Sequence, residues 1–204
     1  MRRLERLLLT LVIGATPPIV GLLAGWWGTV SILPDRGVAV AALAGFAAGL
    51  MIDLVFLRRW IAGAHSAPLW AWAAAYLVYS IGTFGFFMGM PVFNLLLAVP
   101  AGFLFGGRLA RERISPDEVR RRARLASGFT TGVLAAACLT SAALALADPY
   151  TAANLEGMFS LPFDVTTPMI LGVIVAGGAA LLAAQAWAIH ATILWSHARL
   201  STEA

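Results

Sequence analysis

Six long apolar segments divide this sequence and constrain its fold more than any other feature. They cover residues 7–32, 38–57, 69–87, 91–107, 125–147 and 168–195. A helix needs about 20 apolar residues to cross the core of a bilayer. Hydrophobic residues make up 60% of the chain and charged residues 12%, so a water-soluble fold of this size would leave much apolar surface exposed. The sequence therefore predicts an all-α membrane protein, a single integral domain over residues 1–204 that forms a six-helix transmembrane bundle.

The arginines predict the orientation of the helices. All fourteen basic residues are arginine, and all of them except Arg36 flank the apolar segments on one side. Loops on the cytoplasmic side of membrane proteins carry an excess of basic residues. We therefore predict a multi-pass protein of the cytoplasmic membrane with both termini in the cytoplasm. The same placement accounts for the basic charge without a nucleic-acid partner, and the lipid bilayer is the expected environment.

The segment between the fourth and fifth spans carries a helix-start signal at residues 115–118, Ser-Pro-Asp-Glu. A serine N-cap, a proline at the first helical position and a glutamate three residues after the serine form a capping box. The helix is expected to run on into the fifth span. Its cluster of Arg120, Arg121 and Arg122 has two interpretations: a signal that sets topology, or a site for anionic lipid head groups.

Small residues recur at every fourth position of several spans, which places them on one helix face. Helices gain no hydrophobic drive for association in lipid, so close backbone approach matters. We predict a closely packed bundle, with a membrane-protein partner or a homo-oligomer as a further use of these faces. The stripes are Gly37, Ala41, Gly45 and Gly49; Asn94, Ala98, Gly102 and Gly106; Gly128, Gly132, Ala136 and Thr140; and Gly172, Ala176, Ala180, Ala184, Ala188 and Thr192, with a Gly21–Gly25 pair in the first span.

Pro17 and Pro18 lie inside the first span. Each proline removes one helix hydrogen bond and leaves a carbonyl without its usual donor. The pair therefore predicts either a kink or a broken helix, and broken helices line substrate sites in many transporters.

Asp53 is the only acidic residue inside a predicted span. A carboxylate in the membrane costs several kcal/mol unless it is paired or faces water. Its place after Gly45 and Gly49 on one helix face predicts that it points at another helix. We expect a buried charge pair with Arg108 or His190, which lie at similar depth, either as a structural clasp or as a proton or cation relay.

A second group of polar residues follows one face of the third span, at Tyr76, Tyr79, Ser80 and Thr83. Asn94 and Gln185 are placed to face this stripe from the fourth and sixth spans. We predict ligand-binding residues for a small polar or aromatic molecule in an outward-facing pocket, with hydrogen bonding between helices as the alternative. The predicted set is Tyr76, Tyr79, Thr83, Asn94 and Gln185.

The sequence carries no HExxH, Gly-x-Ser-x-Gly, P-loop or GxGxxG motif. Three scattered histidines and one cysteine predict no metal or haem site. We therefore expect no cofactor and no catalytic residue, which favours a protein that is not an enzyme. The leading hypothesis is small-solute transport or a substrate-binding membrane subunit. The alternatives are an accessory or assembly protein that binds another membrane protein, and a lipid-modifying membrane enzyme.

Overall fold

The structure is a computed structural model that describes residues 2–112 and 114–202, with only the backbone of Arg2 and His65. Arg113, one of the arginines counted above, lies outside the described residues. Six helical segments are long and apolar enough to cross a membrane. The elements in chain order are α1 (Arg2–Thr29), α2 (Asp35–Gly63), η1 (Ala64–Ser66), α3 (Leu69–Phe86), η2 (Pro91–Leu97), α4 (Ala98–Arg111), α5 (Pro116–Ala147), α6 (Thr151–Phe159) and α7 (Thr167–Ser201).

Each predicted span coincides with one of these helices, and most helices run past the predicted ends. The fourth span differs, because it begins as the 3-10 helix η2 and becomes α-helical only at Ala98. This start places Pro100 in the first turn of α4, where a missing N–H removes no helix hydrogen bond. α1 continues through Pro17 and Pro18 without a break, so the broken-helix alternative for this span is wrong.

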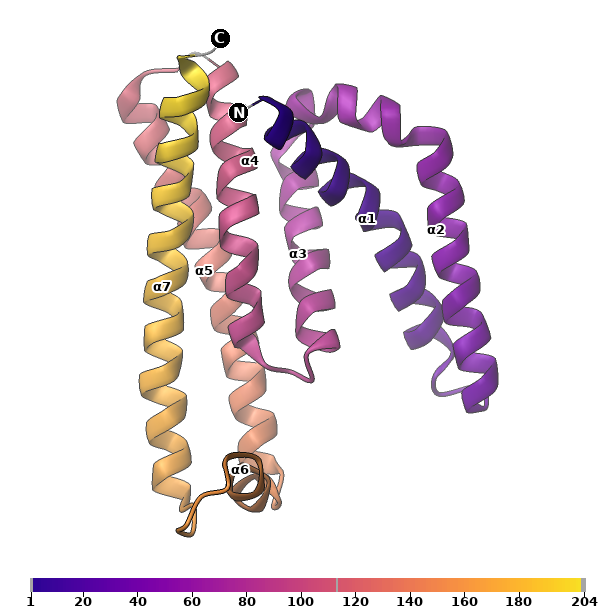
Figure 1. Cartoon of the computed structure of the whole chain (residues 1–204), viewed down its shortest axis with the longest axis vertical. Helices are drawn as coiled ribbons and strands as arrows, with labels where there is room; N and C mark the ends of the chain where they lie inside the picture. Colours follow the sequence, from indigo (N-terminus) through magenta and orange to yellow (C-terminus); the bar gives the residue numbers. More distant parts are fainter. Residues whose placement is uncertain (1, 113, 203–204) are drawn as a thin grey trace.

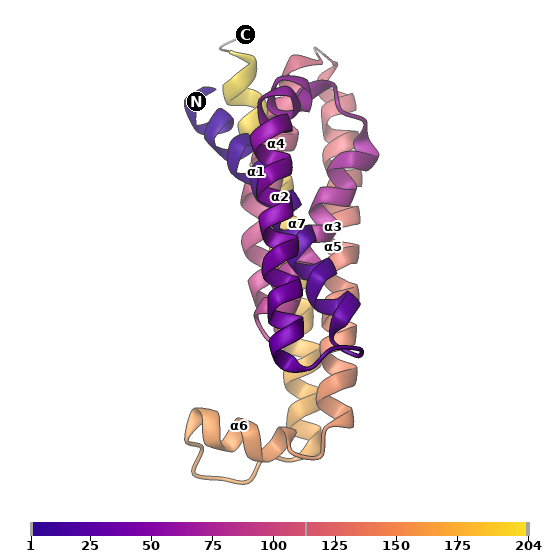
Figure 2. The same cartoon turned by 90° about the vertical axis from the view of Figure 1, so that its right-hand side faces the viewer.

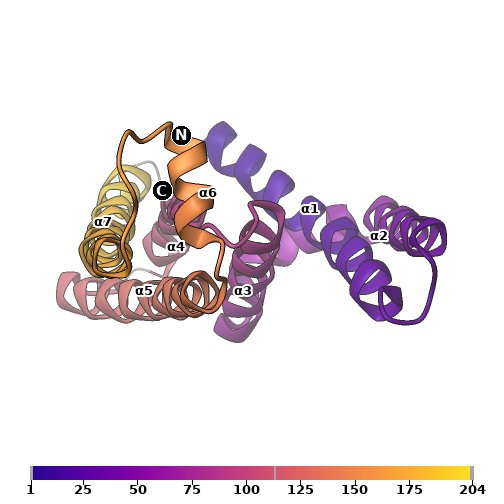
Figure 3. The same ribbon diagram turned by 90° about the horizontal axis from the view of Figure 1, so that it is seen from below.

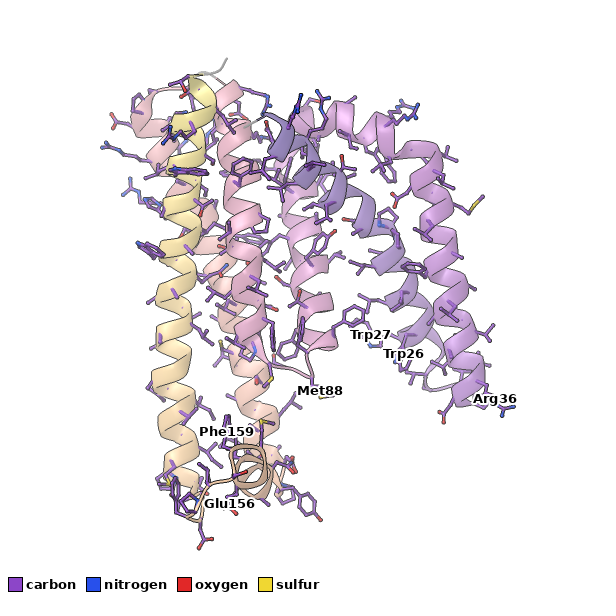
Figure 4. All side chains as sticks on the ribbon, viewed as in Figure 1. Trp26, Trp27, Arg36, Met88, Glu156 and Phe159 are labelled. Atoms are coloured by element: carbon purple, nitrogen blue, oxygen red, sulfur yellow. The ribbon has the colours of Figure 1, made fainter. Side chains whose placement is uncertain are left out.

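The helices form two groups that lie side by side (Figure 1). One is a bundle of α3, η2 with α4, α5 and α7, and the other is a hairpin of α1 and α2 that extends outward from α3 and α4 (Figure 3). Both chain ends lie at the same end of the molecule. At the opposite end, α6 lies across the direction of the long helices and extends to one side of the ends of α5 and α7 (Figure 2). Trp26, Trp27 and Arg36 mark that opposite end of the hairpin (Figure 4).

Backbone contact between glycines joins α1 to α2. A Cβ added to Gly21 would lie 2.1 Å from the carbonyl oxygen of Gly45. A Cβ on Gly49 would lie 2.4 Å from the carbonyl oxygen of Pro17. Only glycine permits this approach, so this part of the α2 stripe faces α1 as backbone against backbone.

The second close pair is α4 with α7. A Cβ on Gly106 would lie 1.9 Å from Ser196 Oγ and 2.5 Å from the carbonyl oxygen of Ile193. Ser196 is fully buried, and its hydroxyl donates to the carbonyl of Gly102 over 3.4 Å. Leu109 and Ile193 fill the core beside this contact. The α5 stripe behaves differently, because Gly128 and Gly132 have nothing within 4 Å of an added Cβ.

Ion pairs connect the helices at the end where the chain termini lie. Arg111 of α4 donates to both carboxylate oxygens of Glu5 of α1, at 2.5 and 2.7 Å. Because Glu5 is 2% exposed, this pair joins the hairpin to the bundle through a buried carboxylate. Arg122 of α5 binds Glu112, next to the end of α4, and also Glu118 within its own helix, the latter at 2.7 Å.

The predicted helix start at Ser115 is confirmed. The Ser115 hydroxyl accepts from the backbone N–H of Glu118 over 3.4 Å, and Pro116 is the first residue of α5. The Glu118 carboxylate accepts from Arg121 and Arg122. The serine cap is therefore present, while the side chain of Glu118 forms ion pairs with Arg121 and Arg122.

Replacing Gly21 with alanine tests the contact between α1 and α2. The added Cβ would lie 2.1 Å from the Gly45 carbonyl oxygen, so the helices must move apart. Overpacking of this kind costs about 1–3 kcal/mol. Gly21→Ala should lower the free energy of unfolding of the purified protein in mixed micelles, although alanine is the better helix former.

Gly28→Ala is the matched control on the same helix, since nothing lies within 4 Å of its added Cβ. This variant should be as stable as the parent or slightly more stable. Equal losses in the two variants would contradict a specific backbone contact at Gly21.

Arg111→Gln tests the link between the hairpin and the bundle. It removes two charge-assisted hydrogen bonds to Glu5, a carboxylate that is almost fully buried. We expect a loss of about 2–3 kcal/mol in the free energy of unfolding. Arg120→Gln is the control, because Arg120 is exposed, and a surface change of this kind should cost less than about 0.5 kcal/mol. A similar loss in both would show that overall charge, and not this pair, sets the stability.

Candidate functional site

A cavity of about 640 Å³ lies between α3 and α5 and reaches η2. We call it the α3–α5 groove. Several lining side chains are partly exposed, including Leu77, Ile81 and Phe129, so the groove opens on the lateral face of the bundle. Its lining residues are Leu77, Ser80, Ile81, Phe84, Asn94, Gly128, Phe129, Gly132, Val133, Ala136, Ala137 and Thr140.

The small-residue stripe of α5 forms one wall of this groove. Gly128, Gly132, Ala136 and Thr140 all line it. Close packing of this stripe against a neighbouring helix within the chain, as expected from its spacing, is not found. The stripe leaves open space because α3 approaches α5 without side chains that fill the gap in front of Gly128 and Gly132.

Ser80 and Asn94 form the buried polar part of the groove. Asn94 is 1% exposed, and its Nδ2 donates to the backbone carbonyl of Ser80 over 3.3 Å. Asn94 Oδ1 and Ser80 Oγ are buried and have no hydrogen-bond partner among the described residues. A buried polar atom without a partner costs roughly 1–3 kcal/mol. The groove therefore presents two oxygens that a bound molecule with an O–H or N–H group would satisfy.

Tyr76 and Gln185 lie beside this polar group and bind each other. Gln185 is fully buried, and its Nε2 donates to the Tyr76 hydroxyl over 2.9 Å. Phe129, which lines the groove, packs against Tyr76 with ring centroids 6.0 Å apart. Gln185 Oε1 is a further buried oxygen that has no hydrogen-bond partner in the described part of the chain. The Tyr76–Gln185 contact therefore supports the groove from within the bundle and does not line it.

The predicted ligand set is thus only partly brought together. Of its five residues, Asn94 alone lines the groove. Tyr79 turns to the other side of α3, where its hydroxyl donates to the carbonyl of Val12 in α1 over 2.6 Å. Thr83 is half-buried near the end of α3 and lies outside the groove lining. Tyr79 and Ser80 are adjacent in sequence, and a helix turns neighbours by about 100° to different faces.

Sequence reasoning missed two features of the groove. The polar stripe includes Ser80 but the predicted ligand set does not, although Ser80 lines the cavity. The α5 glycines are predicted to pack against a helix of this chain, of a partner or of a second copy, whereas a cavity lies in front of them. Spacing identifies which residues share a face, but it does not say whether a neighbouring helix covers that face.

The predicted pairing of Asp53 with Arg108 or His190 is not formed. Arg108 donates to Glu112 over 3.0 Å and to the carbonyl of Ala67 over 2.5 Å. Asp53 faces α1, since α2 packs on α1 at the edge of the molecule, while His190 lies on α7 across the bundle (Figures 1 and 3). The three residues were expected at similar depth, but depth alone does not make helices neighbours.

The arginine cluster at the start of α5 is also divided. Arg121 and Arg122 are bound to Glu118, with N–O distances of 2.7–2.8 Å. Arg120 is exposed on this helix, as is Arg124 one turn further along.

Among the described residues, no group of three or more His, Cys, Asp or Glu side chains is placed to hold a metal ion. Comparison of the chain with protein-family models, with curated proteins and with solved structures finds no match. The α3–α5 groove and the surroundings of Asp53 are the two polar sites of the structure that bear on function.

Proposed function

We propose that this chain binds a small, largely apolar molecule with an O–H or N–H donor in the α3–α5 groove. It acts in small-solute transport or as a substrate-binding membrane subunit. One observation carries the proposal: Ser80 Oγ and Asn94 Oδ1 are buried at the wall of a cavity of about 640 Å³, without hydrogen-bond partners in residues 2–112 and 114–202. Most other lining side chains are apolar, which is the usual composition of a small-molecule site.

The position of the groove supports entry from the bilayer. Ile81 is 48% exposed and Phe129 41% exposed, and both line the opening on the side of the bundle. A molecule dissolved in lipid would reach the polar oxygens without crossing the charged end of the protein. Its donor group would lose few hydrogen bonds on entering, since lipid offers none, and would gain those of Ser80 and Asn94.

The accessory-protein alternative also has an observation in its favour. The open stripe of Gly128, Gly132, Ala136 and Thr140 has the spacing that lets a second membrane helix approach closely. A partner helix in the groove would exclude a small molecule from the same place. The lipid-modifying alternative has less support, because Arg108 and Arg122 are engaged by Glu112 and Asp53 lies elsewhere.

We also propose that the end carrying both termini is cytoplasmic. The ends of α2, α4 and α7 that carry Arg58, Arg111 and Arg199 lie at this end with the start of α1, whereas Arg36 lies at the other (Figures 1 and 4). Basic residues favour the cytoplasmic side during insertion.

Cysteine labelling in intact cells tests this orientation. In a Cys138→Ala background, Asp164→Cys should react with a membrane-impermeant maleimide, since Asp164 is exposed between α6 and α7. Arg120→Cys should react only after the cells are opened. The reverse pattern would place the arginine end outside.

Binding of 2-naphthol to the purified protein tests the groove. The probe is apolar and fluorescent and carries one hydroxyl donor, and 2-methoxynaphthalene has nearly the same shape without the donor. One hydrogen bond corresponds to about tenfold in affinity. We expect saturable binding of 2-naphthol, about tenfold weaker binding of 2-methoxynaphthalene, and loss of this preference in Ser80→Ala.

Gly132→Trp fills the groove and should abolish saturable binding of both probes. Gly172→Trp is the matched control, because Gly172 also has open space before it but lies on α7 outside the groove. Unchanged binding in Gly132→Trp would contradict the proposal. Loss of an oligomer in that variant, with no probe binding in the parent, would favour the accessory-protein alternative.

A further inference from the structure

Asp53 occupies a second polar site, between α1, α2 and α3. It is 7% exposed, and its Oδ1 is buried without a hydrogen-bond partner among the residues that the structure describes. One turn before it, Gly49 lies against Pro17 of α1, and one turn after it, Leu57 lies against Gly14. The turn of α2 that carries Asp53 therefore faces residues 14–17 of α1.

The α1 segment opposite Asp53 is rich in hydrogen-bond acceptors. Pro17 and Pro18 have no N–H, so the carbonyls four residues earlier, at Ile13 and Gly14, lack their helix donors. These carbonyls belong to the same turns of α1 that meet α2 around Asp53. A buried carbonyl without a donor is costly in lipid, as is a buried carboxylate.

The two nearby hydroxyls are already used as donors. Tyr79 of α3 donates to the carbonyl of Val12 over 2.6 Å, and Thr16 of α1 donates to the same carbonyl over 2.7 Å. A hydroxyl has one hydrogen to donate, so neither is left for Asp53 in this arrangement. The surroundings of Asp53 thus contain carbonyl oxygens that can accept a hydrogen bond, while the hydroxyls of Tyr79 and Thr16 donate to Val12.

No basic side chain among the described residues makes up for the missing hydrogen-bond donors around Asp53. Within the described residues, Asp53 makes no salt bridge with any arginine or histidine. From α3, Tyr79 is the titratable side chain near it. On α1, the charged residues Arg3, Glu5 and Arg6 lie about two turns or more before Gly14, and on α2 itself Arg58 and Arg59 are exposed.

We propose that Asp53 is a proton-binding site, neutral in the arrangement seen here, which releases and rebinds its proton. In the neutral form the carboxyl O–H donates to a carbonyl freed by Pro17 or Pro18, which satisfies both groups. On release, the proton passes to water or buffer at the arginine end, and the carboxylate is left with a negative charge. The carboxylate then recruits the hydroxyl of Tyr79 or Thr16 away from Val12.

This exchange alters the contact between α1 and α3, because the hydrogen bond from the Tyr79 hydroxyl of α3 to the Val12 carbonyl of α1 joins the two helices. The site thus couples a proton to the position of α3, the helix that also forms one wall of the groove. The proton site stands on its own residues and holds whether or not the groove binds a small molecule.

Infrared difference spectroscopy of the full-length protein in lipid nanodiscs tests the proposal. The C=O stretch of a protonated carboxyl group absorbs apart from the amide bands and shifts in D₂O. A spectrum at about pH 7 minus one at about pH 10 should contain this band, because exposed carboxyl groups, with ordinary pKa values of about 4, are ionised at both and contribute nothing. Asp53→Asn should remove it, whereas Asp35→Asn should keep it, because Asp35 is an exposed carboxyl in the first turn of the same helix.

A second variant tests the proposal with Asp53 in place, in case the Asp53→Asn protein does not fold. Tyr79→Phe removes the donor that would stabilise the carboxylate, so the band should persist to a pH about one unit higher than in the parent. A variant with a merely structural loss would change stability without moving this midpoint.

Three results would overturn the proposal. The parent protein could lack a protonated-carboxyl band in this difference spectrum, which would show that Asp53 does not release its proton over this range of pH. The band could survive Asp53→Asn and so belong to another group. Replacing choline with sodium at constant pH could remove the band, which would show that an alkali cation occupies the site in place of the proton.

Discussion

Backbone contact between small residues holds the two closest helix pairs of this protein together. Lipid is as apolar as the helix surfaces, so burial of leucine and valine adds little to association. Gly21 with Gly45, and Gly106 with Ile193, instead bring main chains into contact, which increases dispersion contacts over a long surface. The α1–α2 hairpin and the α4–α7 pair are the result, and the other helices are placed around them.

The positions of the two polar sites depend on which helix pairs make close backbone contact and which do not. Between α1 and α2 it draws Asp53 against the proline-containing turns of α1. Between α3 and α5 it is missing, and the α5 glycines face a cavity. The ion pair of Glu5 with Arg111 then joins the hairpin to the bundle at the end where the termini lie. Close backbone contact between α1 and α2 therefore accounts for the closed site at Asp53, and the lack of such contact between α3 and α5 accounts for the open groove.

The number, type and approximate limits of the spans follow from the sequence because a bilayer imposes a length that apolar runs must meet. The start of α5 was also predictable, since the Ser115 cap is a local interaction. Partners were harder to predict. Asp53 was expected to meet Arg108 or His190, but α2 lies at the edge of the molecule and meets α1. Tyr79 and Ser80 were placed on one stripe, yet one binds α1 and the other lines the groove. Local signals define each helix face, while the order in which faces meet depends on all the helices together.

A density map of the purified protein in lipid nanodiscs tests most directly whether α3 and α5 stand apart around a polar site. We predict non-protein density between these helices, within hydrogen-bonding distance of Ser80 Oγ or Asn94 Oδ1, in front of Gly128 and Gly132. A map in which α3 and α5 close on each other, with Ser80 and Asn94 hydrogen-bonded within the protein, would contradict the groove and the function proposed for it.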